Sequence, residues 1–129
     1  MKVAIGIDIG TTAARAVGVD DSGRVIAAAT SAYPLLTPRP QWTEQDPADW
    51  WQAAQIVLAE VAARTGEQRG SVAGIGLTGQ MHGSVFLDAS GEVIRPALQW
   101  NDQRTGAQSA WLYPATAEAM HRLSALAAR

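Results

Sequence analysis

The first residues suited to binding an anion lie where the first apolar run of the chain ends. Asp8 is followed by Gly10, Thr11 and Thr12, so a carboxylate stands beside a turn of one glycine and two hydroxyl side chains. Such a turn can direct backbone N–H groups at phosphate oxygens, because glycine lets an anion approach the backbone closely. Asp8 can hold a hydrated Mg²⁺, which prefers oxygen ligands and keeps most of its waters. The alternative is an ordinary hairpin in which Asp8 accepts from the turn amides.

A second candidate site is the turn Gln80-Met81-His82-Gly83, within the stretch GLTGQMHG. A glycine also precedes Gln80, so the backbone can take conformations closed to other residues and admit a ligand. A neutral imidazole offers one donor and one acceptor, which suits the hydroxyl groups of a polyol. In the alternative, Met81 fills a gap in the core and His82 is a satisfied polar residue at a strand end.

A third candidate is the run Trp100-Asn101-Asp102-Gln103-Arg104, an aromatic plate followed by an amide, a carboxylate and a guanidinium. An indole face packs well on the C–H face of a sugar. The polar residues after it can bind hydroxyls or order the site through an internal ion pair. In the alternative, Trp100 lies in the core, Asn101 or Asp102 caps a helix, and Arg104 pairs with a nearby acid.

Short strands and one long helix are expected to position these sites. Large and small residues alternate from Val3 to Ile9, which predicts a strand with one face in the core. Two more strand-like runs follow, separated by the turn signal DDSG. The predicted antiparallel meander covers residues 3–9, 14–19 and 24–33, and later strands are expected at 72–78, 84–88 and 97–100.

The long helix is predicted between the meander and the later strands. Residues 34–47 are rich in proline and are expected to form a loop. Asp46 and Pro47 supply the side-chain acceptor and the pre-set φ that are typical of a helix N-terminus. Apolar residues at helical spacing then continue to Gly66. This helix is expected to cross over and cover the sheet.

The domain organisation is predicted to change near the end of the chain. Residues 1–105 read as one α/β unit. A further helix is expected from about Gln103, and residues 106–129 read as a helix-prone, alanine-rich tail.

Composition excludes several classes of function. The 129 residues carry 10 Lys and Arg against 12 Asp and Glu, which leaves no excess positive charge for nucleic acid or an anionic membrane. The lack of cysteine excludes disulfides, thiolate catalysis and cysteine metal sites. Neither His82 nor His121 has a metal-ligand partner at useful spacing. The N-terminus MKVAIGIDIG is too polar and short for a signal peptide or membrane span, so we expect a cytoplasmic protein.

Four stretches occur in a fixed order: IGIDIGTTAARAV, WTEQDPADWWQA, GIGLTGQMHGSVFLD and VIRPALQWNDQRT. Over about residues 3–105 this set resembles the N-terminal part of xylulokinases, a branch of the FGGY family of carbohydrate kinases. MHG followed by WND is specific, whereas DxGTT is shared by the whole sugar kinase, Hsp70 and actin superfamily. Gluconate and ribulose kinases of the family are less close. The resemblance implies a ribonuclease H-like α/β fold, here an incomplete N-terminal domain with a mixed sheet and a crossover helix.

The resemblance also implies roles for the three candidate sites. It places ATP phosphates and Mg²⁺ near Asp8, Gly10, Thr11 and Thr12, with Asp8 bound to the metal through water. It places the ketose D-xylulose beside the second and third sites. The implied sugar-binding residues are Gln80, Met81, His82, Gly83, Trp100, Asn101 and Asp102, with Arg104 either structural or facing the substrate.

The implied reaction is the transfer of the ATP γ-phosphoryl group to D-xylulose. Full kinases of the family are several times longer, and their catalytic base is a downstream aspartate that no residue here matches. We therefore expect a truncated form that is inactive or very weak alone. Two alternatives are a sugar-binding module without catalysis and an actin-like partner-binding domain. The last of these predicts an exposed apolar face and self-association.

Overall fold

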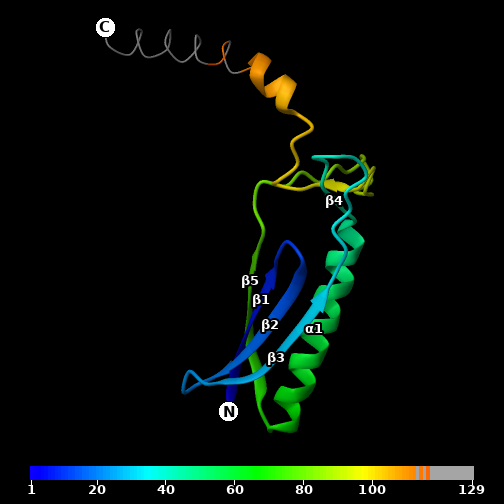
Figure 1. Ribbon diagram of the computed structural model, residues 1–129. Coiled ribbons are helices and arrows are strands. Elements are labelled where there is room, and N and C mark those ends of the chain that lie inside the picture. The colour runs from blue at the N-terminus through cyan, green and yellow to red at the C-terminus, as the bar shows by residue number, and fades with distance from the viewer. Residues whose placement is uncertain (113, 115, 117–129) are drawn as a thin grey trace, which may run out of the picture.

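The core of the molecule is a four-stranded sheet in the order β3-β2-β1-β5 (Figure 1). The structure is a computed structural model that describes residues 1–112, 114 and 116. The first three strands, β1 (Lys2–Ile9), β2 (Ala13–Asp20) and β3 (Val25–Ala32), form an antiparallel meander. β5 (Ser71–Gly79) lies parallel to β1. The predicted meander, the mixed sheet and the late strand are therefore confirmed.

Helix α1 (Pro47–Glu67) begins at the predicted residue and covers one face of the sheet, mainly over β2 and β3 (Figure 1). The Asp46 side chain caps it by accepting from the Ala48 N–H at 2.9 Å. Val57 and Val61 are fully buried against the sheet. Gly18 permits this approach, because a Cβ there would lie 3.2 Å from Val61 Cγ1. The crossover helix is confirmed.

The two faces of the sheet differ, as the alternation in β1 predicts. Val3, Ile5 and Ile7 are at most 4% exposed and face α1. Gly6 and Asp8 lie on the opposite, open face, because successive side chains of a strand point to opposite sides. Asp8 shares that face with Arg15 and Thr78 of the neighbouring strands.

An exposed apolar groove lies between α1 and the edge strand β5. Trp51, Ile75 and Leu77 are 66%, 59% and 76% exposed. The lining residues are Ile7, Ile9, Trp50, Trp51, Ala54, Leu58, Ile75 and Leu77. An exposed apolar face of this kind is the feature that the partner-binding alternative predicts.

Beyond the end of the main sheet, β4 (Glu44–Gln45) pairs antiparallel with β6 (Ala97–Leu98) (Figure 1). The loop predicted at 34–47 therefore contains a short strand. The strand predicted at 97–100 is only two residues long.

The strand predicted at 84–88 is wrong. This segment makes only isolated bridges, from Ser84 to Leu98 and from Leu87 to Val93. Between the two bridges, the segment from Val93 to Leu98 is longer than the segment from Ser84 to Leu87 that it faces. The two segments therefore do not keep the constant register that a ladder needs. Pro96 lies in that interval and has no N–H to contribute to a ladder.

The chain after β6 turns before it becomes helical. Residues 106–112 are helical, so the helix begins later than the predicted Gln103. Asp102 does not cap it, because its carboxylate accepts instead from Thr43 and Arg104. Most of the predicted tail lies outside the described residues, and the boundary near residue 105 stays a prediction. None of the helices in the described part of the chain is long and apolar enough to span a membrane.

Candidate functional site

The first two candidate sites begin at the ends of neighbouring parallel strands. Ile9 at the end of β1 pairs with Gly79 at the end of β5. The Gln80 N–H also donates to the Ile9 carbonyl at 2.8 Å. The chain therefore leaves both strands at the same end of the sheet, first as the Gly10 turn (residues 10–12) and later as the His82 turn (residues 80–83).

The Gly10 turn has all of its carbonyl groups engaged by hydrogen bonds. The Gly10 carbonyl accepts from the Tyr33 hydroxyl, and the Thr12 carbonyl accepts from the Tyr33 N–H at 3.2 Å. The Thr11 carbonyl accepts from Gln45 Nε2 at 2.7 Å. The sequence analysis missed both Tyr33 and Gln45. The only signal was the position of Gln45 in the stretch WTEQDP.

Asp8 lies beside the Gly10 turn on the open face of the sheet. Its Oδ2 atom is 3.4 Å from where a Cβ of residue 10 would stand, so the glycine leaves room next to the carboxylate. Its neighbours across the strands are Arg15 on β2 and Thr78 on β5. These three residues line a hollow of about 450 Å³ on that face. The carboxylate of Asp8 therefore adjoins the Gly10 turn, and the binding of phosphate and Mg²⁺ there stays a prediction.

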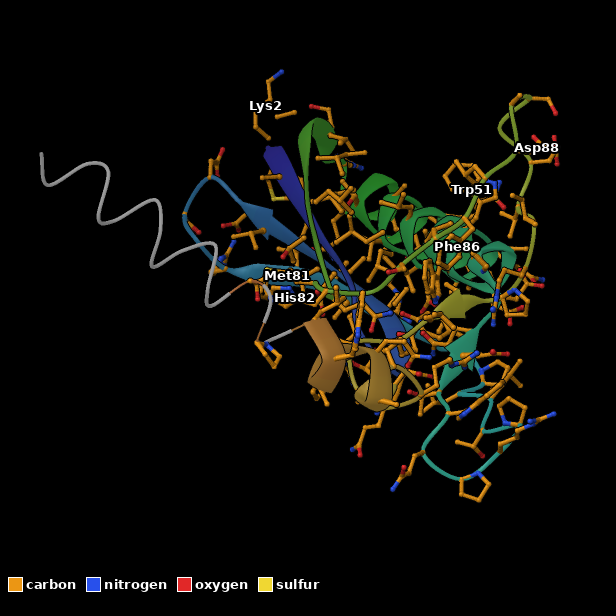
Figure 2. All side chains as sticks on the ribbon, turned by 90° about the horizontal axis from the view of Figure 1, so that it is seen from above. Lys2, Trp51, Met81, His82, Phe86 and Asp88 are labelled. Atoms are coloured by element: carbon orange, nitrogen blue, oxygen red, sulfur yellow. The ribbon has the colours of Figure 1, made fainter. Side chains whose placement is uncertain are left out.

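The two central side chains of the His82 turn are exposed to solvent. Met81 is 72% exposed and His82 is also exposed. Figure 2 shows the two side by side in the segment that follows β5. His82 has a φ of 63°, in the left-handed region that few residues other than glycine adopt. Met81 does not fill a gap in the core, so that part of the alternative is wrong, whereas the alternative for His82 as a polar residue at a strand end stays open.

A small pocket of about 200 Å³ opens next to the His82 turn. It lies against the start of α1, where the Trp50 indole N–H donates to Gln45 Oε1 at 3.0 Å. Gln80 Nε2 donates to the same oxygen at 3.2 Å. The lining residues are Ile9, Trp50, Gly79, Gln80, His82, Gly83 and Val85.

Trp100 joins the third candidate site to the first. Its indole Nε1 donates to Thr11 Oγ1 at 3.3 Å, although the two residues are 89 positions apart in the sequence. The side chain is 57% exposed, so one part of the ring remains open for packing on a ligand. Trp100 is therefore not a core residue. The aromatic plate stands directly beside the Gly10 turn.

Asn101 and Asp102 fix the loop that carries Trp100. Asn101 Oδ1 accepts from the Thr43 hydroxyl at 2.8 Å, and Asp102 Oδ2 accepts from the Thr43 N–H at 2.8 Å. Arg104 donates to both oxygens of Asp102 at 2.7 to 2.9 Å. This is the internal ion pair that the sequence left open as one role of the polar run.

The cluster around Arg104 is nearly buried. The Arg104 and Asp102 side chains are 11% and 5% exposed. Arg104 also contacts Glu44 Oε1 at 2.7 Å and stacks 3.8 Å from the ring centroid of Trp42. Asp102 and Glu44 raise the pKa of Arg104 above its ordinary value. Of the two roles that the resemblance allows for Arg104, these contacts favour the structural one.

The Asp102 ion pair predicts a stability loss at acid pH. Hydrogen bonds from Arg104, together with the Thr43 N–H, lower the pKa of Asp102 from 3.8 to about 2. The group stabilises the fold above pH 4 and loses that contribution as the pH falls through about 2. Urea unfolding at a series of pH values should show this decrease in the free energy of unfolding. In the Asp102→Asn variant, that free energy should depend less on pH over the same range.

The donor set around the Gly10 turn fits a hydrated Mg²⁺ better than a site built wholly from protein ligands. Asp8 supplies one carboxylate, and Thr11 and Thr12 supply hydroxyl oxygens nearby. Within the described residues, no three His, Cys, Asp or Glu side chains gather as a metal site. Mg²⁺ commonly binds one or two carboxylates, several waters and the phosphates of a nucleotide.

Comparison with known proteins places the sequence of this chain in one family. The model of the FGGY family of carbohydrate kinases, N-terminal domain, matches residues 3–124. The xylulose kinase of Bacillus subtilis is 42% identical over 108 residues, which are 84% of this chain and 22% of that protein. The xylulose kinase of Escherichia coli is 41% identical over 100 residues, which are 78% of this chain and 20% of that protein.

Solved structures give the same result. The structure of xylulose kinase from Rhodospirillum rubrum superposes with a TM-score of 0.82 at 41% identity, covering 87% of this chain and 23% of that one. The chain thus spans about a fifth of the length of the curated relatives that it matches. The fold is that of the sugar kinases of the actin-like superfamily, as predicted. By sequence and by structure, the chain belongs to the FGGY family of carbohydrate kinases.

Proposed function

We propose that this chain supplies the phosphate-binding and ketose-binding turns of an ATP-dependent xylulose kinase. The observation that carries the proposal is the hydrogen bond from Trp100 Nε1 to Thr11 Oγ1 at 3.3 Å. It joins an exposed aromatic plate, suited to the C–H face of a sugar, to a turn suited to phosphate. A sugar hydroxyl and a transferable phosphoryl group would meet there.

The reaction that we propose for the whole protein is phosphorylation of a terminal hydroxyl of D-xylulose. The hydroxyl oxygen bonds to the γ-phosphorus, the bond from that phosphorus to the ADP oxygen breaks, and the hydroxyl proton passes to a base. We assign that base to a part of the protein beyond these residues. Catalysis of this kind depends on positioning and charge neutralisation. The chain would contribute both through its two turns.

The residues divide between the two substrates. Asp8 would hold Mg²⁺ through water, and the amides of Thr11 and Thr12 would bind phosphate oxygens of ATP. When bound, Mg²⁺ would neutralise charge on the phosphates. The ketose would be held by the second and third candidate sites. Direct contacts are assigned to Met81, His82 and Trp100, with the turn shaped by Gln80 and Gly83 and the loop held by Asn101 and Asp102.

Xylulose is favoured over other polyols by the relatives. Proteins named xylulose kinase match this chain at 41 to 42% identity. The family model matches residues 3–124, which contain both turns. We extend their substrate to this protein as part of the proposal.

The His82→Ala variant tests the ketose assignment. Loss of the imidazole should weaken binding of D-xylulose by about 1 to 3 kcal/mol, because sugar hydroxyls lose their partner. Binding is measured by titrating the purified chain with D-xylulose and following backbone amide resonances. Lys2→Ala is the control, since Lys2 is exposed at the opposite end of β1 (Figure 2). Unchanged affinity in His82→Ala, or equal weakening in Lys2→Ala, would contradict the assignment.

A further inference from the structure

We propose that Tyr33 and Gln45 are positioning residues that hold the carbonyls of the Gly10 turn inward and thereby aim its amides at a phosphate. The inference rests on the proposed function, because it concerns how the same turn binds ATP. Neither residue is expected to touch the substrates. Each acts through a backbone carbonyl of the turn.

The first step concerns which groups of the turn are used. The carbonyls of Gly10 and Thr11 accept from the Tyr33 hydroxyl and from Gln45 Nε2, the second at 2.7 Å. The Gly10 N–H is also used, because it donates to the Ala13 carbonyl at 3.0 Å. The N–H groups of Thr11 and Thr12 have no partner among the residues that the structure describes. The turn thus keeps two adjacent donors free.

The second step follows from the planarity of the peptide bond. In a trans peptide the carbonyl and the following N–H point in opposite directions, and the structure contains no cis peptide bond in its described residues. Fixing the Gly10 carbonyl on Tyr33 therefore directs the Thr11 N–H away from Tyr33. Fixing the Thr11 carbonyl on Gln45 directs the Thr12 N–H away from Gln45. Two adjacent N–H groups that are free and point away from these side chains are available to bind an anion.

The orientation of the Gln45 amide is determined by its partners. The Trp50 indole can only donate, and it meets Oε1 at 3.0 Å. The carbonyls of Thr11 and Pro34 can only accept, and they meet Nε2 at 2.7 and 3.2 Å. A flipped amide would set oxygen against two carbonyls. Gln45 is 0% exposed, so its Nε2 is fixed as the donor to the turn.

Gln45 also contacts the His82 turn, to which we assign the ketose. Its Oε1 accepts from Gln80 Nε2 at 3.2 Å, in addition to Trp50. One buried amide therefore bridges the Gly10 turn and the His82 turn. Tyr33 has no such bridge. The Tyr33 hydroxyl is protonated at neutral pH even at its ordinary pKa of 10.0, and burial, and next the charge of Asp8, raise that pKa further, so the hydroxyl stays a donor.

The test compares Tyr33→Phe and Gln45→Met with the wild-type chain. Tyr33→Phe keeps the ring and removes only the hydroxyl, and Gln45→Met keeps a similar shape without the amide. The exposed Gln55 on α1 provides the matched control, Gln55→Met. Each protein is titrated with MgADP and, separately, with D-xylulose, while the amide resonances of Thr11 and Thr12 are followed. A melting curve of each variant reports its folding.

We expect both variants to bind MgADP about tenfold more weakly, with a smaller response of the Thr11 and Thr12 amides. Tyr33→Phe should keep D-xylulose affinity within about threefold, whereas Gln45→Met should also lose some, since it contacts Gln80. Gln55→Met should match the wild type. If Gln45→Met fails to fold, Tyr33→Phe alone decides the test.

Two results would overturn the inference. In the first, Tyr33→Phe binds MgADP as tightly as the wild type, or loses both ligands equally, while the wild type binds both. The proposed function would then stand without this positioning role. In the second, the wild-type Thr11 and Thr12 amides do not respond to MgADP at all. The nucleotide part of the proposed function would then fall, and the inference with it.

Discussion

Replacing Arg104 with methionine is expected to destabilise the fold by about 3 to 5 kcal/mol, because it leaves the buried carboxylate of Asp102 without its cationic partner. Asp102 and Glu44 are 5% and 11% exposed at the side chain, and Arg104 contacts both at 2.7 Å. The stacking of Arg104 on Trp42 is lost as well. The loop that carries Trp100 would lose its anchor, so the site would be lost together with stability. Urea unfolding at neutral pH measures the effect.

Arg95→Met is the matched control for this prediction. Arg95 also contacts Glu44 at 2.7 Å, but its side chain is 41% exposed. Exposed ion pairs contribute about 0 to 1 kcal/mol, so this variant should be nearly as stable as the wild type. The Arg104→Met defect should also shrink at acid pH, because protonation removes the unpaired charge of Asp102. Equal losses in the two variants would show that burial of the ion pair is not what matters.

The second large effect is expected for Asp8→Ala. This variant should bind MgADP about ten- to a hundredfold more weakly, because it lacks the carboxylate beside the Gly10 turn that would hold hydrated Mg²⁺. D-xylulose affinity should stay unchanged, since the His82 turn is intact. Without Mg²⁺ the sign should reverse, because removing a negative charge favours an anionic nucleotide. Isothermal titration calorimetry with and without Mg²⁺ measures all three quantities.

Asp21→Ala is the control for Asp8→Ala, since Asp21 is an exposed aspartate in the turn between β2 and β3. It should leave both affinities unchanged. Equal loss of MgADP and D-xylulose in Asp8→Ala would contradict the separation of the two subsites. Weaker binding of ADP in the absence of Mg²⁺ would contradict the role of Asp8 with the metal.

The elements that the sequence predicted correctly are those with strong local signals. The alternation in β1 places Val3 and Ile5 in the core, and the burial follows it. Asp46 and Pro47 mark the start of α1 because capping is a local interaction. The position of the Gly10 turn after β1 follows from the same local pattern. These features need no knowledge of distant contacts.

The features that the sequence did not reveal depend on residues far apart in the chain. The carboxylate of Asp102 accepts from the N–H of Thr43, 59 positions earlier. Its role in anchoring the loop therefore cannot be predicted from the residues next to it in the sequence. The carbonyl of Thr11 is bound by Gln45, 34 positions later. The strand predicted at 84–88 failed for a related reason, because strands depend on the register of their partner. Local alternation did not reveal the register change near Pro96.

The same division applies to the candidate site. The residue types at Asp8, His82 and Trp100 pointed to phosphate and sugar chemistry before their positions were known. Their convergence comes from the parallel pairing of β1 with β5 and from the contact of Trp100 with Thr11. Sequence therefore supplied the proposed chemistry of the candidate site, and tertiary structure supplied the arrangement of its residues.

The indole N–H resonance of Trp100 provides the most direct test of the claim that the two turns form one site. It can be assigned by its loss in Trp100→Phe, and its nitrogen lies 3.3 Å from Thr11 Oγ1. The account predicts that this single resonance shifts saturably with D-xylulose and, in a separate titration, with MgADP. A resonance that responds to neither ligand, or to only one of them, would contradict the claim.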